Sequence, residues 1–114
     1  MAQPATFEDM VAEALDALPE WVLERLENVE VLIEDRPPRG EPNLLGRYHG
    51  IPLTERRSYA GVLPDTITLY RSTIERSAAA HGDSVRTVVA HTVVHEIAHF
   101  FGISDDRLRQ LDRY

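Results

Sequence analysis

The chain has 114 residues and no cysteine, which suits one domain over residues 1–114 and excludes disulfides, a thiolate nucleophile and a Cys-based zinc finger. All twelve basic residues are Arg, which excludes a Schiff-base or P-loop lysine, and the net charge of −7 argues against a nucleic-acid partner. No apolar run approaches the roughly 20 residues of a membrane span, and the acidic N-terminus lacks the basic region of a secretory signal, so we expect a cytoplasmic protein without a membrane partner.

The first part of the chain predicts two helices. Thr6 is a typical N-cap, and the apolar residues after it recur with a 3.6-residue period up to Leu18. Pro19 interrupts this period and is suited to the first turn of a second helix over residues 20–26. In that helix we expect the following side chains to enter the core: Trp21, Val22, Leu23 and Leu26.

The middle of the chain predicts strands. Residues 29–34 alternate between apolar and polar positions, as a half-buried strand does. The segment 36–43 holds three prolines and a glycine and is expected to be a loop, and 44–49 is a candidate strand. We expect 56–63 to be a weak strand or an ordered loop. Pro64 and Asp65 suggest a turn before 66–70, a β-branched and aromatic segment that is typical of a strand.

The C-terminal part predicts three helices. Residues 71–80 are helical in character, and His81-Gly82 should end that helix. Asp83 or Ser84 can cap a long helix that reaches about Phe101, whose apolar residues cover most of its circumference and indicate burial. After Gly102, Ser104 can cap a short last helix over residues 105–113. Together these elements predict an α/β (α+β) fold with a mixed sheet packed on helices.

The long helix carries the residues that point to chemistry. His95 and His99 are one turn apart and therefore share a face, so that both imidazoles can bind one metal ion. Glu96 lies about 100° round the helix, where it can act as a general base beside the metal. Titratable groups on a buried helix need partners, and a metal ion is one such partner.

A third ligand is expected from the segment after the helix. Gly102 can adopt the left-handed conformation that turns the chain sharply, and Asp105 follows ten residues after the first histidine. Two imidazoles and a carboxylate favour Zn²⁺, and three protein ligands leave the fourth position to water, as in catalytic sites.

The segment 95–105 resembles the zincin metallopeptidases, in the extended form His-Glu-x-x-His-x-x-Gly-x-x-His/Asp. It differs from metzincins because its third ligand is Asp and because no methionine follows the motif, and the downstream Glu ligand of thermolysin-like enzymes is absent too. A family of small bacterial zincin-like metallopeptidases is a better match. That likeness extends over residues 44–48, 51–56, 63–71, 94–102 and 105–108.

This resemblance implies a small zincin-like domain with the active-site helix near the C-terminus. Its expected function is hydrolysis of peptide bonds in a peptide or protein substrate, with Zn²⁺ held by His95, His99 and Asp105 and with Glu96 as general base. Two alternatives remain open at this point. One is a metal-dependent endoribonuclease, which usually lacks a Glu directly after the first His, and the other is a non-catalytic zinc-binding interaction module.

Several other residues are weaker candidates. His91 shares the face of His95 and His99, and we expect it to pack or to support the ligands rather than to bind the metal, because a fourth protein ligand would displace the water. Asp106 is an alternative to Asp105. Residues expected to border the cleft, where a Tyr or Arg can stabilise an oxyanion, are Tyr48, His49, Arg57 and Tyr59. The arginines of the last helix, which are expected to form a solvated face, are Arg107, Arg109 and Arg113.

Overall fold

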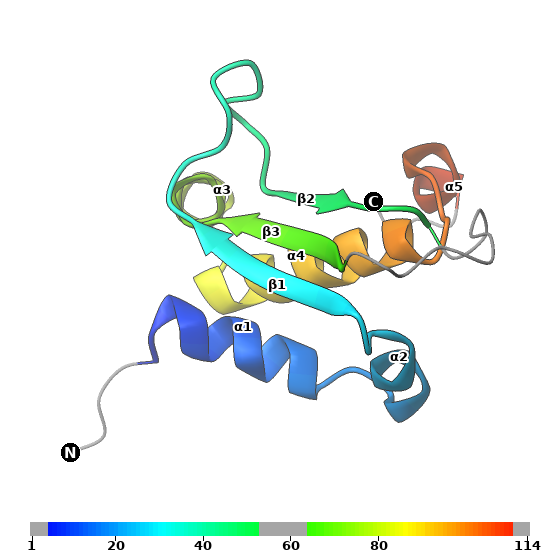
Figure 1. Cartoon of the computed structure of the whole chain (residues 1–114). Helices are drawn as coiled ribbons and strands as arrows, with labels where there is room; N and C mark the ends of the chain where they lie inside the picture. Colours follow the sequence, from blue (N-terminus) through cyan, green and yellow to red (C-terminus); the bar gives the residue numbers. More distant parts are fainter. Residues whose placement is uncertain (1–4, 53–63, 111–114) are drawn as a thin grey trace.

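The computed structural model describes residues 5–52 and 64–110. Within them the chain forms five helices and three strands, an α+β architecture (Figure 1). In chain order the elements are α1 (Phe7–Asp16), α2 (Glu20–Arg25), β1 (Val29–Glu34), β2 (Gly46–His49), β3 (Asp65–Tyr70), α3 (Arg71–His81), α4 (Val85–Phe100) and α5 (Asp105–Gln110).

The three strands form one mixed sheet with the order β1-β3-β2. β1 and β3 are parallel, with Val31 opposite Ile67, and β2 is antiparallel to β3, with Tyr48 opposite the same Ile67. β2 is therefore an edge strand of the sheet as described. Asp65 belongs to β3, because its backbone N–H donates to the Asn28 carbonyl at 3.1 Å and continues the ladder. The prediction of a turn at Pro64-Asp65 is therefore wrong for Asp65, which lies in a strand.

The core lies between the sheet and the helices. Strand residues Ile67 and Leu69 are almost completely buried, as are Val89 and Val93 of α4. The central strand supplies alternate side chains to the helical layer, since successive residues of a strand point to opposite faces. α4 contacts β2, β3, α1 and α3, so it is the element around which the fold packs (Figure 1).

The helix ends follow the chemistry of their caps. Thr6 accepts a hydrogen bond from the Asp9 N–H at 3.0 Å, and the Asp9 carboxylate accepts one from the Thr6 N–H, which is a capping box. Ser84 caps α4 by accepting from the Thr87 N–H at 3.0 Å. Gly82 ends α3 in the left-handed conformation, with φ of 70°. These three predicted ends are confirmed.

Two predictions about burial are wrong. Trp21 is 62% exposed and Leu23 is 40% exposed, because a helix of six residues presents one narrow side, occupied by Val22, to the core. α4 is also less enclosed than its apolar composition indicates, since Ala90 and Val94 are exposed to solvent.

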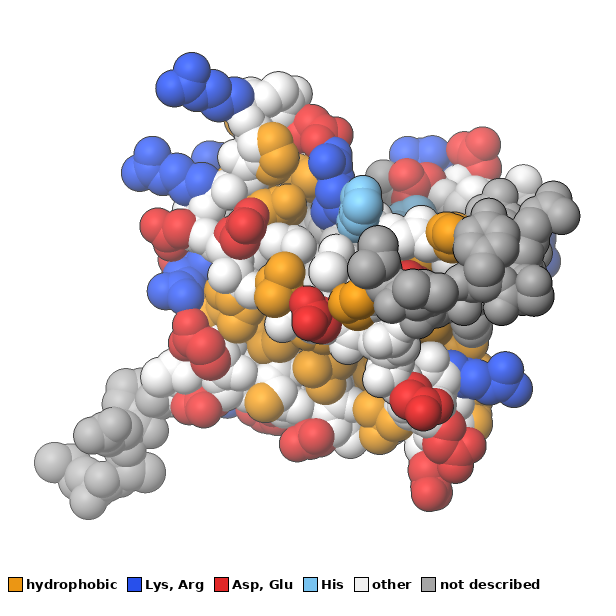
Figure 2. Space-filling view, viewed as in Figure 1, with side chains coloured by type: hydrophobic (Ala, Val, Ile, Leu, Met, Phe, Trp, Pro, Cys, Tyr) orange, Lys and Arg blue, Asp and Glu red, His pale blue; other side chains and the backbone are white. Residues whose placement is uncertain are grey.

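The remaining expectations concern boundaries and the surface. The predicted strand at 44–49 is confirmed over Gly46–His49, while the prediction for residues 56–63 and the end of the last helix lie outside the described residues. No helix in the described ranges has the length and apolar character needed to cross a membrane. Acidic side chains occupy much of the lower surface in Figure 2, where Figure 1 places α1 and α2.

Candidate metal centre

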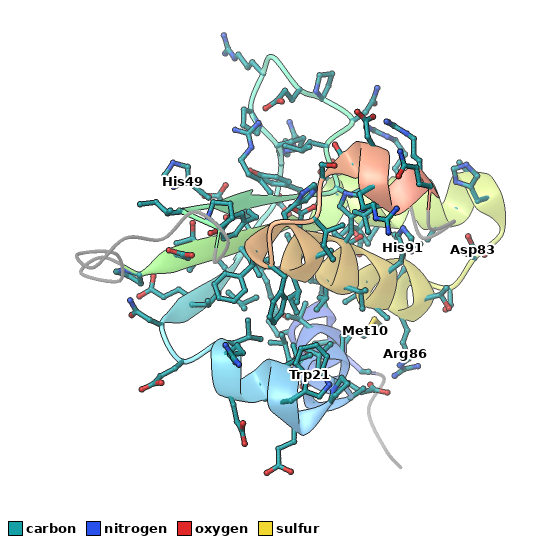
Figure 3. The ribbon with its side chains drawn as sticks, turned by 90° about the vertical axis from the view of Figure 1, so that its right-hand side faces the viewer. Met10, Trp21, His49, Asp83, Arg86 and His91 are labelled. Atoms are coloured by element: carbon teal, nitrogen blue, oxygen red, sulfur yellow. The ribbon has the colours of Figure 1, made fainter. Side chains whose placement is uncertain are left out.

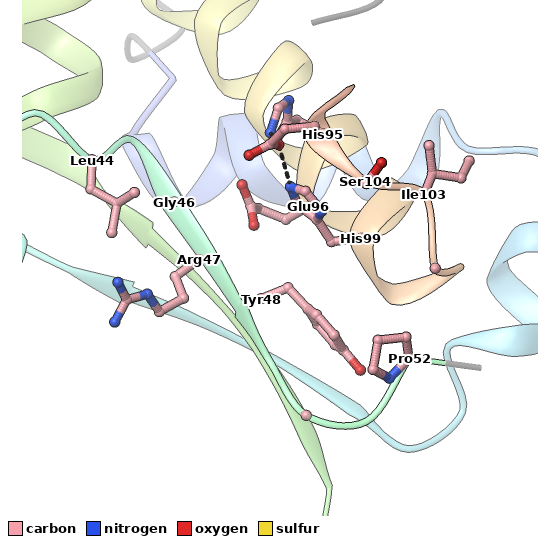
Figure 4. A pocket seen from close by; sticks show the side chains of 13 residues that line it. Leu44, Gly46, Arg47, Tyr48, Pro52, His95, Glu96, His99, Ile103 and Ser104 are labelled. Atoms are coloured by element: carbon pink, nitrogen blue, oxygen red, sulfur yellow. Dashed lines mark ion pairs between the residues drawn. The ribbon is translucent and has the colours of Figure 1, made fainter. Parts of the chain in front are cut away.

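Three side chains from two elements meet beside the C-terminal end of α4. The Nε2 atom of His99 lies 2.9 Å from Oδ1 of Asp105, and Nε2 of His95 lies 3.2 Å from the same oxygen (Figure 4). Ligand atoms of His95, Glu96 and His99 all lie within 4.8 Å of one another. The four residues that the sequence singles out are therefore brought together in space.

The turn after α4 explains how Asp105 reaches the two histidines. The Ile103 N–H donates to the Ala98 carbonyl and the Gly102 N–H donates to the His99 carbonyl, each at 2.9 Å. This pair of bonds is a Schellman motif, with Gly102 in the left-handed conformation at φ of 86°. The chain reverses within these residues and begins α5 at Asp105, beside the histidines that it has just passed.

The two distances from Asp105 to the histidine nitrogens are close to those between ligands of a tetrahedral site. Two ligand atoms that each lie 2.0–2.1 Å from Zn²⁺ at the tetrahedral angle are about 3.3 Å apart, and the two contacts of Asp105 measure 2.9 and 3.2 Å. Oδ1 of Asp105 is enclosed, and a ring nitrogen of each histidine faces it. An enclosed carboxylate oxygen that faces two ring nitrogens in this way is suited to share a cation with them.

The surroundings of His95 favour its neutral form, which is the form that binds a metal ion. Burial and the neighbouring His99 ring lower the pKa of His95 below its ordinary value, although Asp105 opposes the shift. A neutral imidazole keeps a lone pair on one nitrogen and can donate it to a metal ion.

Glu96 occupies a different position from the other three. It is 6% exposed, and burial raises the pKa of its carboxyl above the ordinary value, while His99 and a hydrogen bond from the Tyr48 backbone N–H oppose the shift. Gly46 of β2 lies directly over this part of α4: a Cβ atom there would be 3.3 Å from Glu96 Cγ and 2.9 Å from Thr92 Cγ2. The carboxylate is thus held between α4 and the edge strand.

A cavity of about 700 Å³ opens in front of these residues. One wall is β2 with the residues after it, and the other is formed by α4 and the turn that leads to α5 (Figure 4). No residue type or spacing in the sequence marks the following lining residues as members of a site: Leu44, Gly46, Arg47, Gly50, Pro52, Ile103 and Ser104. The residues from Leu44 to Pro52 reach the cavity through the pairing of β2 with β3, and Ile103 and Ser104 reach it through the turn after α4, so tertiary contacts and not a local pattern identify them.

The other candidate residues are not among the side chains that meet at Asp105. Tyr48 lines the cavity, but its hydroxyl donates to Oδ2 of buried Asp65 at 2.6 Å and points away from the histidines (Figure 4). His49 is exposed and does not line the cavity. His91 is also exposed, with its ring centroid 6.2 Å from that of His95. Arg57 and Tyr59 lie outside the described residues.

The residues of α5 divide between the site and the solvent. Asp106 is exposed and pairs with Arg109 at 3.2 Å, so Asp105 and not Asp106 faces the histidines. Arg107 donates to Gln110 at 3.1 Å. Both described arginines of this helix are solvated, as expected, and Arg113 lies outside the described residues.

Comparison with known proteins agrees with this arrangement. The family described as zincin-like metallopeptidase matches residues 26–114. A solved structure of a conserved hypothetical protein from Thermus thermophilus is similar, with 26% identity and a TM-score of 0.55 over 93% of this chain and 94% of the other. No curated protein matches the chain. Because the family match covers more than half of the residues, including all of those at the site, this chain belongs to the zincin-like metallopeptidase family.

Proposed function

We propose that this protein is a zinc-dependent metallopeptidase that hydrolyses peptide bonds. The observation that carries the proposal is the convergence of two ring nitrogens, from His95 and His99, on one enclosed oxygen of Asp105. Membership of the zincin-like family supports it. In this proposal these three side chains hold the ion and Glu96 acts as the general base.

The donor set favours zinc. Two imidazoles and one carboxylate suit Zn²⁺ better than Mg²⁺ or Ca²⁺, which prefer oxygen ligands. A bound zinc ion supplies Lewis acidity, which makes water a nucleophile near neutral pH and favours negative charge on a carbonyl oxygen. With three protein ligands, the site retains one position for water or substrate.

Glu96 is suited to move protons during the reaction. A general base works best when its pKa lies near the working pH, and burial raises the pKa of this carboxyl above its ordinary value. The hydrogen bond from the Tyr48 N–H orients the carboxylate. Glu96 would accept a proton from the attacking water and later deliver it to the leaving amine.

The edge strand β2 is placed to orient an extended substrate. β2 forms one wall of the cavity through Gly46, Arg47 and Tyr48. An extended peptide can be aligned beside an edge strand by main-chain hydrogen bonds, and such a peptide would pass Glu96. This arrangement favours peptide over RNA, as does the net charge of −7.

Metal content and peptide cleavage, measured on matched variants, test the proposal. The purified protein should contain about one zinc ion per chain by elemental analysis, and His95→Ala and His99→Ala should each lose it, because two ligands bind a catalytic zinc ion poorly. Glu96→Gln should retain zinc while cleavage of a peptide library falls by at least about a hundredfold.

Three results would contradict the proposal in distinct ways. Full zinc content in both histidine variants would remove the metal site. Zinc binding without cleavage of any peptide by the wild-type protein would leave a non-catalytic zinc-binding module. Cleavage of RNA that depends on Glu96 would assign the same site to an endoribonuclease.

A further inference from the structure

A second cavity, of about 760 Å³, also reaches the Glu96 carboxylate, from the side opposite to the cavity described above. It shares four lining residues with the cavity in front of the candidate metal centre, namely Leu44, Gly46, His95 and Glu96. The first cavity continues from these residues toward Gly102 and Asp105. The second continues toward the N-terminal end of α4, so the candidate site lies in the middle of a longer groove.

The length of the second cavity follows from the geometry of α4. Its lining includes Val88, His91, Thr92 and His95, which recur at helical spacing on one side of the helix, and it reaches Asp83 just before the helix begins. The helical part of this wall runs from Val85 to His95, ten positions further along the chain, and at 1.5 Å per residue it covers about 15 Å. An extended peptide rises about 3.3 Å per residue. The second cavity, which we call the arm, therefore has room for about five residues of substrate.

The walls of this arm are held in place. Arg76 of α3 donates to the Pro42 carbonyl at 3.0 Å and to the Asn43 side chain at 3.1 Å. These bonds fix the loop before β2, whose residues Leu44 and Leu45 form the wall opposite α4. The wall that contains Leu44 and Leu45 is therefore anchored to α3, and these two residues make it apolar.

Carboxylates are present toward both ends of the arm, while Arg76 lies behind its wall at Asn43. Among its lining residues in the described part of the chain, Asp83 and Glu96 are acidic, and none is Arg. His81 and His91 also border it, and Figure 3 shows His91 and Asp83 on the side of the molecule away from His49. A cationic side chain on the substrate would be attracted toward the Asp83 end, while an anionic one would be repelled.

From this geometry we infer that the arm between α4 and residues 43–46 binds about five residues of an extended polypeptide on one side of the scissile bond, with a preference for a basic side chain near Asp83. The inference rests on the proposed peptidase function and narrows its substrate class to polypeptides that extend on both sides of the cleaved bond. A substrate with a free terminus at the scissile bond would leave one arm empty.

Equilibrium binding of labelled peptides to the zinc-loaded Glu96→Gln protein tests the inference without cleavage. The probes are fluorescein-labelled peptides of alanine and serine, about four or about twelve residues long, and the longer one is made with either an Arg or a Glu near each end in turn. We expect the longer peptide to bind at least about tenfold more tightly, because it fills both arms. The best-placed Arg should bind about two- to five-fold more tightly than Glu at the same position, as exposed ion pairs do.

Substitutions on and beside α4 test whether the tighter binding of the longer peptide depends on the arm. Thr87 is exposed and lines the arm, so Thr87→Trp should narrow it and remove the advantage of the longer peptide. Ala90 is exposed on the same helix but lines neither cavity, so Ala90→Trp is the matched control and should leave binding unchanged. Asp83→Asn should abolish the preference for Arg over Glu.

The outcomes separate this inference from the proposed function. Equal affinity for short and long peptides, or the same behaviour in Thr87→Trp and Ala90→Trp, overturns the arm as a substrate site even if the wild-type protein cleaves peptides. Length-dependent binding that Thr87→Trp abolishes supports the arm, and an absence of cleavage in the wild-type protein would then count against the peptidase function alone.

Discussion

At the scale of single residues, the site depends on side chains that are fixed by neighbours outside the motif. Tyr48 is the clearest case, because its backbone N–H donates to Glu96 while its hydroxyl donates to buried Asp65. Its ring also packs edge-on against Phe100, with centroids 5.9 Å apart. One residue of the edge strand therefore links the candidate base to the start of β3.

Removal of the Tyr48 hydroxyl tests this link. Tyr48→Phe deprives the buried Asp65 carboxylate of a hydrogen bond, so the free energy of unfolding should fall by about 1–3 kcal/mol. Chemical denaturation followed by circular dichroism measures the change. Zinc content should remain near one ion per chain, because Tyr48 is not among the proposed ligands.

The adjacent residue supplies the control for this prediction. His49 is exposed, and His49→Ala should change the stability by no more than about 0.5 kcal/mol. Equal stability of Tyr48→Phe and the wild-type protein would show that the bond to Asp65 contributes nothing.

At the scale of elements, the site is assembled from a helix, the turn after it and an edge strand. α4 supplies three of the four residues, and the Schellman turn at Gly102 returns the fourth. β2 covers Glu96 closely because Gly46 has no side chain. The conformation of Gly102 and the smallness of Gly46 are therefore both requirements of the site.

Gly102→Ala tests the role of the turn. A left-handed conformation costs a residue with a Cβ atom about 1 kcal/mol or more, and relief of this strain would displace Asp105. We expect lower stability together with zinc affinity weakened by at least about tenfold, measured by competition with a chelator.

Gly82→Ala is the matched control for the turn. Gly82 has a similar φ of 70° with nothing near its missing Cβ, at the end of α3. It should lose a similar amount of stability and retain the zinc affinity of the wild-type protein. A loss of zinc affinity that is the same in both variants would contradict the proposed role of the Gly102 turn.

Gly46→Ala tests the close approach of β2 to α4. The new methyl group would lie 2.9 Å from Thr92 Cγ2 and 3.0 Å from the Thr68 carbonyl oxygen, and overpacking of this kind typically costs about 1–3 kcal/mol. Peptidase activity should fall more than zinc content, because the strand shifts against Glu96 rather than against the ligands.

A second substitution checks the cause of this effect. Thr92→Ser removes the crowded methyl group and keeps the hydroxyl that donates to the Val88 carbonyl at 2.7 Å. Thermal unfolding of the double variant should show partial recovery of stability. If Thr92→Ser brings no recovery, the contact with Thr92 is not the source of the loss.

At the scale of the whole molecule, the metal is expected to contribute to stability. The proposed ligands connect α4 to α5, and α5 has only six described residues, of which Leu108 is buried. A ligand that binds only the folded state stabilises it by about 4 kcal/mol at a thousand times its dissociation constant.

Removal of the metal tests this contribution. Treatment with a chelator should lower the midpoint of thermal unfolding by several degrees, and a stoichiometric addition of zinc should restore it. The His99→Ala variant should show the lower midpoint from the start and no response to the chelator. An identical response to the chelator in both proteins would mean that the stabilising metal lies elsewhere.

Local features of the chain were sufficient to predict the helices, the three strands and the four motif residues, because caps, periodicity and the spacing of the histidines are local properties. His95 and His99 are one turn apart in any α-helix, and Gly102 ends this one because a left-handed residue is needed there.

Long-range packing determined which strand covers the motif and which apolar residues are buried. The parallel pairing of β1 with β3 and the antiparallel pairing of β2 place Tyr48 and Gly46 over Glu96. Trp21 and Val94 remain exposed although both are apolar. Pairing and burial depend on contacts between residues far apart in the chain, and periodicity along one segment carries no information about its partner.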